Sequence, residues 1–152
     1  MNENQSRILS ITSDRAMELF LNLINSGEDC PLTGSGNSMR PFLKNENDIL
    51  LMTSIKGKKL KVGDIVLYQR DNNQYVIHRL YKICPNGTFC FVGDNQYQVE
   101  YNVLGDQLIA KAKAVIINGK AINCEHSLVR KKYAIRMFLR VKAFRLYRVL
   151  FS

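Results

Sequence analysis

Near the start of the chain, hydrophobic residues recur at the spacing of a helix. Between Thr12 and Ile24 they follow an i, i+3, i+4, i+7 pattern, which places them on one helical face. Thr12 or Ser13 can cap the start of this helix, and Gly27 can end it. The pattern predicts one amphipathic helix, too short to be a DNA-binding domain. Its apolar face consists of Met17, Phe20, Leu21 and Ile24.

From Leu32 to Asn123 the pattern changes to short apolar runs separated by turn residues. Such runs predict strands, and Asn86-Gly87 and Asn118-Gly119 predict hairpins because Asn and Gly tolerate positive φ. Short strands joined by tight turns favour a mainly β fold, either a coiled antiparallel sheet or a partly open barrel. The expected strands are 48–53, 64–69, 75–83, 88–92, 107–117 and 121–123.

A helix-compatible segment extends from about Ser127 to the end of the chain. Its apolar stripe is imperfect, since Arg130 and Arg148 fall on the same face as Tyr133 and Met137. Such a stripe is typical of an interfacial helix whose cationic stems lie along an apolar surface, or of a helix that docks an acidic partner. We therefore expect a basic C-terminal helix rather than a buried core helix.

Length and composition predict one folded domain with appended ends. A chain of 152 residues with a hydrophobic share of 46% can bury a core, and the absence of any low-complexity run argues against disorder. We divide it into an N-terminal amphipathic helix segment (1–29), a β domain (30–125) and a basic helical tail (126–152).

The net charge of +9 is concentrated in the tail. Residues 128–152 contain eight Lys and Arg and no Asp or Glu, so they contribute +8 and leave +1 for the remainder. We expect a peripheral contact of this segment with an anionic membrane. Nucleic-acid binding is less favoured, although aromatic residues alternate with the arginines. These aromatic residues are Tyr133, Phe138, Phe144 and Tyr147.

The pattern contains no export or membrane-spanning signal. No apolar run approaches the roughly 20 residues needed to cross a bilayer. The first apolar region is interrupted by Asp14, Arg15 and Glu18 and lacks the basic lead of a secretory signal. The expected location is therefore the cytoplasm, with the inner face of the membrane as an alternative.

Four cysteines are scattered without the spacing of metal ligands, so we expect reduced thiols and neither a metal nor another cofactor. Cys84 and Cys90 flank the Asn86-Gly87 hairpin. They would face each other across a loop of odd length and lie on opposite faces with a two-residue turn. The other two cysteines are Cys30 and Cys124.

Ser38 and His78 are the candidate catalytic pair. Gly34, Gly36 and Pro41 bend the chain around Ser38, so its hydroxyl can project beside backbone N–H groups. A serine hydroxyl is a poor nucleophile until a base takes its proton, and a neutral imidazole suits that task near neutral pH. Structural roles for both side chains remain alternatives, and Lys82 is a less favoured base.

Three further segments extend this pair into a family resemblance. They are the strand start Gly63-Asp64-Ile65-Val66, the turn Gly93-Asp94-Asn95, and Glu100, six residues after Asp94. Together with Ser38 and the His78-Arg79 pair they resemble the type I signal peptidase clan, which includes signal peptidases and self-cleaving repressors. The His-Arg pair is similar to the histidine-base branch found in the endoplasmic reticulum and in sporulating bacteria, here without a transmembrane anchor.

The resemblance implies roles for individual residues. It implies a Ser-His dyad, or a triad whose third member is Asp94 or Glu100; the family has aspartate where this chain has Glu100. The Ser38 backbone N–H would hold the oxyanion, and no side-chain donor is available at Gly36. The oxyanion and substrate-binding segment comprises Gly36, Asn37, Met39 and Pro41, and the structural supports are Gly63, Asp64, Arg79 and Gly93, with Arg79 expected to pair with a turn aspartate.

These features predict a serine endopeptidase that cleaves a leader or signal-like peptide after small residues. Its expected partner is a peptide or preprotein laid beside a strand edge. The alternative is a non-catalytic module that captures a peptide or partner protein at the same edge, with a basic tail that binds membrane or nucleic acid.

Overall fold

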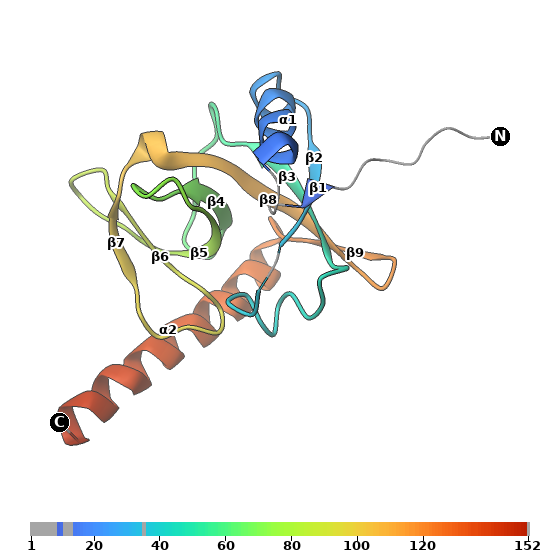
Figure 1. Ribbon diagram of the computed structural model, residues 1–152. Helices are drawn as coiled ribbons and strands as arrows, with labels where there is room; N and C mark the ends of the chain where they lie inside the picture. Colours follow the sequence, from blue (N-terminus) through green and yellow to red (C-terminus); the bar gives the residue numbers. More distant parts are fainter. Residues whose placement is uncertain (1–8, 11–13, 35, 152) are drawn as a thin grey trace.

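The computed structural model describes residues 9–10, 14–34 and 36–151, and Figure 1 shows how their elements are arranged. The helix predicted over 12–24 is present as Asp14–Asn25, and its cap candidates Thr12 and Ser13 lie outside the described residues. The fold is mainly β with a helix at each end, as predicted. The elements are β1 (Leu9–Ser10), α1 (Asp14–Asn25), β2 (Cys30–Thr33), β3 (Ile49–Ser54), β4 (Ile65–Gln69), β5 (Tyr75–Ile83), β6 (Phe89–Val92), β7 (Glu100–Val103), a 3-10 turn η1 (Gly105–Gln107), β8 (Leu108–Ile117), β9 (Lys120–Asn123) and α2 (Ser127–Phe151).

The strands form one open, coiled sheet in the order β1-β2-β3-β8-β4-β5-β6-β7. β1 and β2 are parallel, and the other neighbours are antiparallel. The long strand β8 pairs with β3 along one edge, and its other edge is shared by β4 and β9. Register shifts between Leu51 and Met52 and between Leu67 and Tyr68 accompany this sharing, because bulges let a sheet bend.

Strand existence follows the hydrophobic pattern closely. β5 has the predicted bounds, β4, β6, β8 and β9 differ from prediction by one residue at one end, and β3 is shifted by one residue at both ends. The pattern missed the two-residue β1 and also β2 and β7, each four residues long. β2 contains Pro31, and β7 contains Asn102 at a φ of 60°, which are features usually found in turns.

Both faces of the sheet are covered. On one face, α1 buries Met17, Phe20 and Ile24 in the core that includes Leu50 from β3 and Leu67 from β4. The other core is built on β4 to β8 and includes Val66, Tyr68, Leu80 and Phe91. Strand β5 is therefore buried on both sides over most of its length, which explains why its sequence does not alternate simply between apolar and polar residues.

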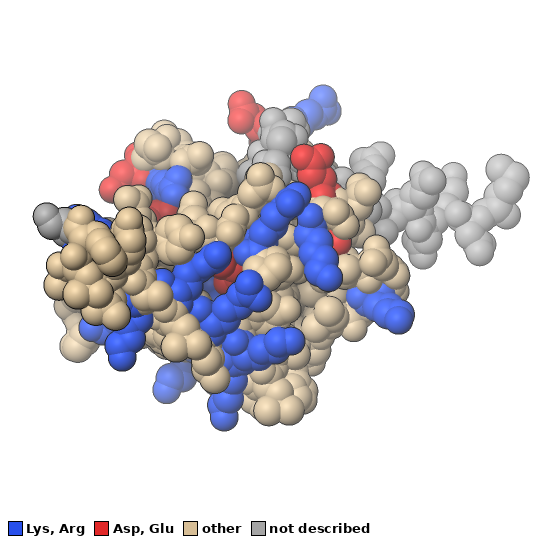
Figure 2. Space-filling model, turned by 90° about the horizontal axis from the view of Figure 1, so that it is seen from below, with Lys and Arg blue, Asp and Glu red and all other residues tan. Residues whose placement is uncertain are grey.

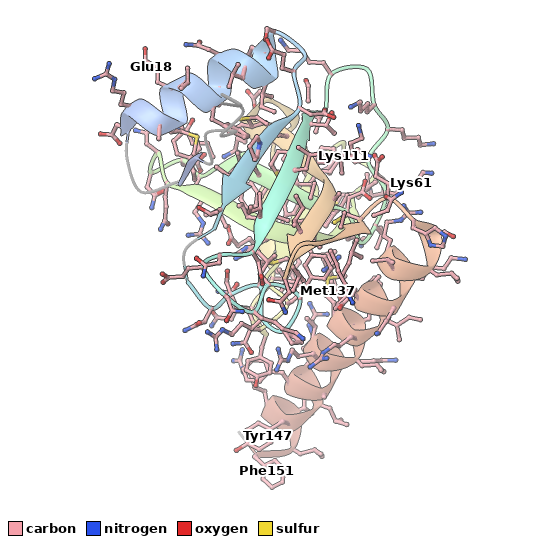
Figure 3. The ribbon with its side chains drawn as sticks, turned by 90° about the vertical axis from the view of Figure 1, so that its right-hand side faces the viewer. Glu18, Lys61, Lys111, Met137, Tyr147 and Phe151 are labelled. Carbon is pink, nitrogen blue, oxygen red and sulfur yellow. The ribbon has the colours of Figure 1, made fainter. Side chains whose placement is uncertain are left out.

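Helix α2 crosses the body and buries Ala134, Met137 and Val141 against it (Figure 3). It approaches the start of β4 so closely that a β-carbon on Gly63 would lie 3.0 Å from the Arg130 carbonyl oxygen. Gly63 also has a φ of 94°, so glycine is needed there on two grounds. In the described part of the chain, no helix combines the length and apolar character required to cross a membrane.

The cysteines are all unbonded. The Cys84 N–H donates to the Thr88 carbonyl and closes a three-residue loop, Pro85–Gly87. The loop has odd length, so Cys84 and Cys90 share a face, and their Sγ atoms lie 3.5 Å apart. This is the arrangement that the sequence predicts for an odd loop.

Candidate active site

A pocket of about 390 Å³ lies between the loop after β2 and the first half of β5. Ser38 lines it from the loop and His78 from the strand. β6 pairs with β5 only from Arg79 onward, whereas β4 pairs along its whole first half. Among the described strands, the edge of β5 over Tyr75–His78 that faces away from β4 has no partner, and these residues line the pocket. An open strand edge therefore runs beside Ser38.

The backbone of Ser38 is held by the turn at 93–95. Its carbonyl oxygen accepts a hydrogen bond from the Asn95 N–H at 2.7 Å. A β-carbon on Gly93 would come within 2.6 Å of the same oxygen, closer than any side chain allows. The loop is anchored further by Met39 and Phe42, both buried in the core. Position 93 therefore needs glycine for the turn to pack against the Ser38 backbone.

His78 is 2% exposed, and its Nδ1 atom faces two polar groups. The Tyr68 hydroxyl lies 3.2 Å from it and Glu100 Oε1 lies 3.3 Å from it. An ionised carboxylate can only accept, so in the neutral imidazole an Nδ1–H donating to Glu100 leaves Nε2 as the acceptor nitrogen. Burial and then the charge of Glu100 raise the pKa of Tyr68, which keeps its hydroxyl protonated. Strands β4, β5 and β7 thus position one buried imidazole.

Glu100 also forms hydrogen bonds with Arg70, the residue that follows β4. Arg70 Nε donates to Glu100 Oε2 at 2.9 Å, and Arg70 Nη2 donates to Oε1. Burial alone would raise the pKa of Glu100, but the hydrogen bonds with His78 and Arg70 outweigh it and hold the pKa at about 2. The hydrogen bond with Glu100 raises the pKa of Arg70. Glu100 is therefore a carboxylate throughout the neutral range.

Arg79 is the point where the separate motif segments meet. Its Nε and Nη2 donate to both carboxylate oxygens of Asp94 at 2.7 and 2.6 Å, and its Nη1 donates to the Gly63 carbonyl at 2.8 Å. The rings of Phe42 and Tyr133 each lie 5.0 Å from the guanidinium carbon. The arginine is 2% exposed, so these contacts compensate a charge removed from water. One buried cation thus ties the serine loop, β4, the 93–95 turn and α2 together.

A comparison with models of protein families shows to which family the chain belongs. The model for peptidase S24-like proteins matches residues 3–122 of the 152-residue chain. The chain belongs to the peptidase S24-like family. This membership supports a serine-peptidase-like fold and the wider clan that the sequence resembles, and the matched segment ends before α2. No curated protein matches the sequence.

In this S24-like chain the two candidates for the third catalytic member occupy different places. Glu100 reaches His78, whereas Asp94 directs both oxygens to Arg79. The ion pair expected between Arg79 and a turn aspartate is present. Asp64 accepts the Lys61 N–H at 2.9 Å at the start of β4, as a turn-stabilising residue does.

The structure also brings the residues flanking Ser38 to the pocket. Gly36, Asn37 and Met39 line it, whereas Pro41 is not among the lining residues. The alternative base Lys82 is exposed and lies beyond the register shift that follows Leu80. Of these two candidate bases, His78 is the one that lines the same pocket as Ser38.

Two residues of the site escaped the sequence analysis, Tyr68 and Arg70. Tyr68 lies in β4, in a segment predicted only as a strand, and Arg70 directly follows that segment and was given no role. A tyrosine within an apolar strand does carry a signal, because a buried hydroxyl needs a partner. The sequence could not name that partner, since His78 belongs to the next strand and its register with β4 is set by the fold.

Proposed function

We propose that this S24-like protein is a serine endopeptidase of the histidine-base type, in which Ser38 is the nucleophile and His78 the general base. The observation that carries the proposal is the shared pocket, which is lined by both a half-buried serine and a buried imidazole. Glu100 is the third member, because it contacts Nδ1 and leaves Nε2 available for the serine proton. Asp94 has a structural role.

The chemistry follows from these roles. Ser38 Oγ attacks the scissile carbonyl carbon while His78 takes the hydroxyl proton. The resulting oxyanion is stabilised by the Ser38 backbone N–H. His78 then returns the proton to the leaving amine, the C–N bond breaks, and an acyl-enzyme remains. Water, deprotonated by His78, hydrolyses this ester and restores the serine.

No hydrogen bond joins the side chains of Ser38 and His78, although both are described residues lining one pocket. Catalytic hydrogen bonds are often long in substrate-free enzymes and tighten when substrate binds. A peptide that fills the pocket would exclude water between the two groups. We therefore assign the final approach to the substrate complex.

The open edge of β5 favours an extended peptide as substrate. A peptide strand can pair with the free edge at 75–78 and pass its scissile bond beside Ser38. Small residues before the cut, and a leader or signal-like peptide as the natural substrate, follow from the resemblance to signal peptidases. The same edge could also serve a non-catalytic binding module, which is the competing function.

A serine-directed acylating probe distinguishes the two functions. We expect the wild type to be labelled, Ser38→Ala to be unlabelled, and His78→Ala to be labelled at least about a hundredfold more slowly. Ser54→Ala and His126→Ala, which change the same residue types outside the pocket, should match the wild type. Mass spectrometry of the labelled peptide places the adduct.

Equal labelling of the wild type, Ser38→Ala and His78→Ala would overturn the catalytic proposal. If a peptide then bound all three proteins equally without being cut, the binding module would replace the enzyme. Circular dichroism of each variant checks that a loss of labelling does not come from unfolding.

A further inference from the structure

Two aromatic residues of α2 pack against the body of the protein. Phe138 packs on Tyr81 with ring centroids 5.0 Å apart, and Phe144 stacks on Tyr97 at 4.9 Å. Met137 points from the helix into the body (Figure 3). These aromatic rings therefore stabilise the contact of α2 with the sheet and are not presented for stacking with the bases of a nucleic acid.

The outward face of α2 carries an aliphatic stripe along the whole helix. Its members follow one another by seven, four, seven and four positions, so at 100° per residue they fall on one line opposite Ala134 and Met137. Each is between 59% and 70% exposed. The stripe consists of Leu128, Ile135, Leu139, Leu146 and Leu150.

Cations flank this stripe, and α2 contains no acidic residue. Lys131, Lys132, Arg136 and Lys142 are exposed and lie within about 60° of the stripe on the helical wheel. Figure 2, which views the molecule from the side of α2, shows Lys and Arg gathered on this surface. Their long stems can lie along an apolar phase while the charged ends reach anionic groups. A continuous aliphatic stripe that is more than half exposed is unusual on a surface that contacts only water.

The end of the helix extends beyond the sheet. Tyr147 and Phe151 lie at its far tip in Figure 3 and pack on each other at 4.9 Å. Phe151 is 74% exposed and Val149 is 79% exposed. The tip thus adds aromatic and aliphatic surface at the place where it could enter an interface first.

We propose that α2 is an interfacial helix that lays its outward face on an anionic lipid bilayer. The apolar stripe would enter the boundary between headgroups and acyl chains, and the flanking cations would contact the lipid phosphates. The inner face would keep its contacts with the body, so binding needs no refolding. This surface lies outside the segment that matches the S24-like family and does not depend on the proposed peptidase activity.

Charge complementarity favours the bilayer over a second copy of the chain. Lys132 and Lys142 interrupt the aliphatic line at heptad positions, so two helices packed along their stripes would bring lysines of like charge together. An anionic bilayer instead pairs these lysines with phosphates. The same positions that oppose dimerisation therefore support lipid binding.

Co-sedimentation of the full chain with vesicles tests the proposal. We expect at least about tenfold stronger binding to vesicles that mix phosphatidylglycerol with phosphatidylcholine than to phosphatidylcholine alone, with weakening at high salt. A variant without the flanking cations should bind the vesicles that contain phosphatidylglycerol about tenfold more weakly, or weaker still. It carries Gln in place of Lys131, Lys132, Arg136 and Lys142. A control variant removes the same charge from other surfaces and should change vesicle binding far less. It carries Gln in place of Lys56, Lys59, Lys82 and Lys120.

A second pair of variants tests the aliphatic stripe. Leu139→Asn with Leu146→Asn should weaken vesicle binding about tenfold, because two side chains no longer enter the acyl region. Leu19→Asn with Leu104→Asn changes two exposed leucines elsewhere and should leave it unchanged. Thermal unfolding confirms that all variants fold, and labelling by the acylating probe in solution should be the same for each.

Four results would overturn the proposal. Equal binding to both vesicle types, or equal loss in the stripe variants and their controls, would show that α2 does not recognise anionic lipid. A dimer that sediments without vesicles and dissociates in Leu139→Asn with Leu146→Asn would assign the stripe to a second copy. Tight RNA binding without vesicle binding would assign the cations to nucleic acid.

Discussion

The protein contains two arginine–carboxylate pairs with similar geometry and different surroundings. Arg79 and Asp94 are both nearly inaccessible to solvent, with side chains 2% and 3% exposed, whereas Arg70 and Glu100 are 33% and 28% exposed. The buried pair contacts the Gly63 backbone and the rings of Phe42 and Tyr133, which come from three other segments, and the outer pair contacts the imidazole of His78. The same chemistry therefore serves the fold at one place and the candidate site at the other.

Depth explains this division. A buried charge must keep its partner, because its lost hydration is not otherwise replaced, so Arg79 and Asp94 are tied to one arrangement. A half-exposed pair is weakly stabilising, and its carboxylate can share a hydrogen bond with a third group. Glu100 can therefore orient His78, while Arg70 keeps the Glu100 carboxylate ionised.

Breaking each pair should have very different effects on stability. Arg79→Met leaves Asp94 buried without its cation and should lower the free energy of unfolding by about 3–5 kcal/mol. Arg70→Met, the matched change at the outer pair, should lower it by about 1 kcal/mol or less. Urea unfolding measures both. Equal losses would show that depth does not separate the two pairs.

Removing the charge of Glu100 and removing the charge of Asp94 should have different effects on catalysis. If Glu100 orients His78, Glu100→Gln should reduce kcat/KM for a cleaved peptide on the order of 10²–10³-fold, with a loss of stability of only about 1 kcal/mol. Asp94→Asn should mainly destabilise the fold. Steady-state kinetics with urea unfolding of the same samples measures both quantities. Unchanged turnover in Glu100→Gln would reduce the triad to a dyad of Ser38 and His78.

The outer pair should also give the protein an acid-sensitive component of stability. Because the pKa of Glu100 falls from its ordinary 4.5 to about 2 on folding, its contribution is complete above 4.5 and is lost as the pH falls toward 2. In Glu100→Gln this component, on the order of 1 kcal/mol, should be missing. Urea unfolding from pH 6 to pH 2.5 measures it, and parallel curves for the two proteins would contradict it.

The smallest expected effect is a change in the pKa of Glu100. Arg70→Gln removes a cation that lowers the pKa of Glu100, so that pKa should rise by about one unit. Arg40→Gln removes a charge from the same pocket without a contact to Glu100 and serves as control. Carbon NMR of the Glu100 carboxyl group follows both titrations. A pKa equal to that of the wild type would mean that His78 alone holds Glu100 ionised.

Most of the local structure can be predicted from the order of apolar and polar residues. The apolar runs predicted β3, β4, β5, β6, β8 and β9, and the periodic positions predicted α1, because hydrophobic spacing reports directly on which side of an element is buried. The motif segments also pointed to Ser38 and His78 as candidates. Local patterns carry this information because each depends on neighbouring residues only.

Which of these residues contact one another depends on the packing of distant strands. Asp94 and Glu100 were equal candidates in the sequence, and the pairing of β5 with β4 and of β6 with β7 brought Glu100 to His78 and left Asp94 with Arg79. Tyr68 and Arg70 entered the site in the same way. Contacts between distant strands depend on register and sheet curvature, which arise from the packing of the whole body and are not written in any short segment.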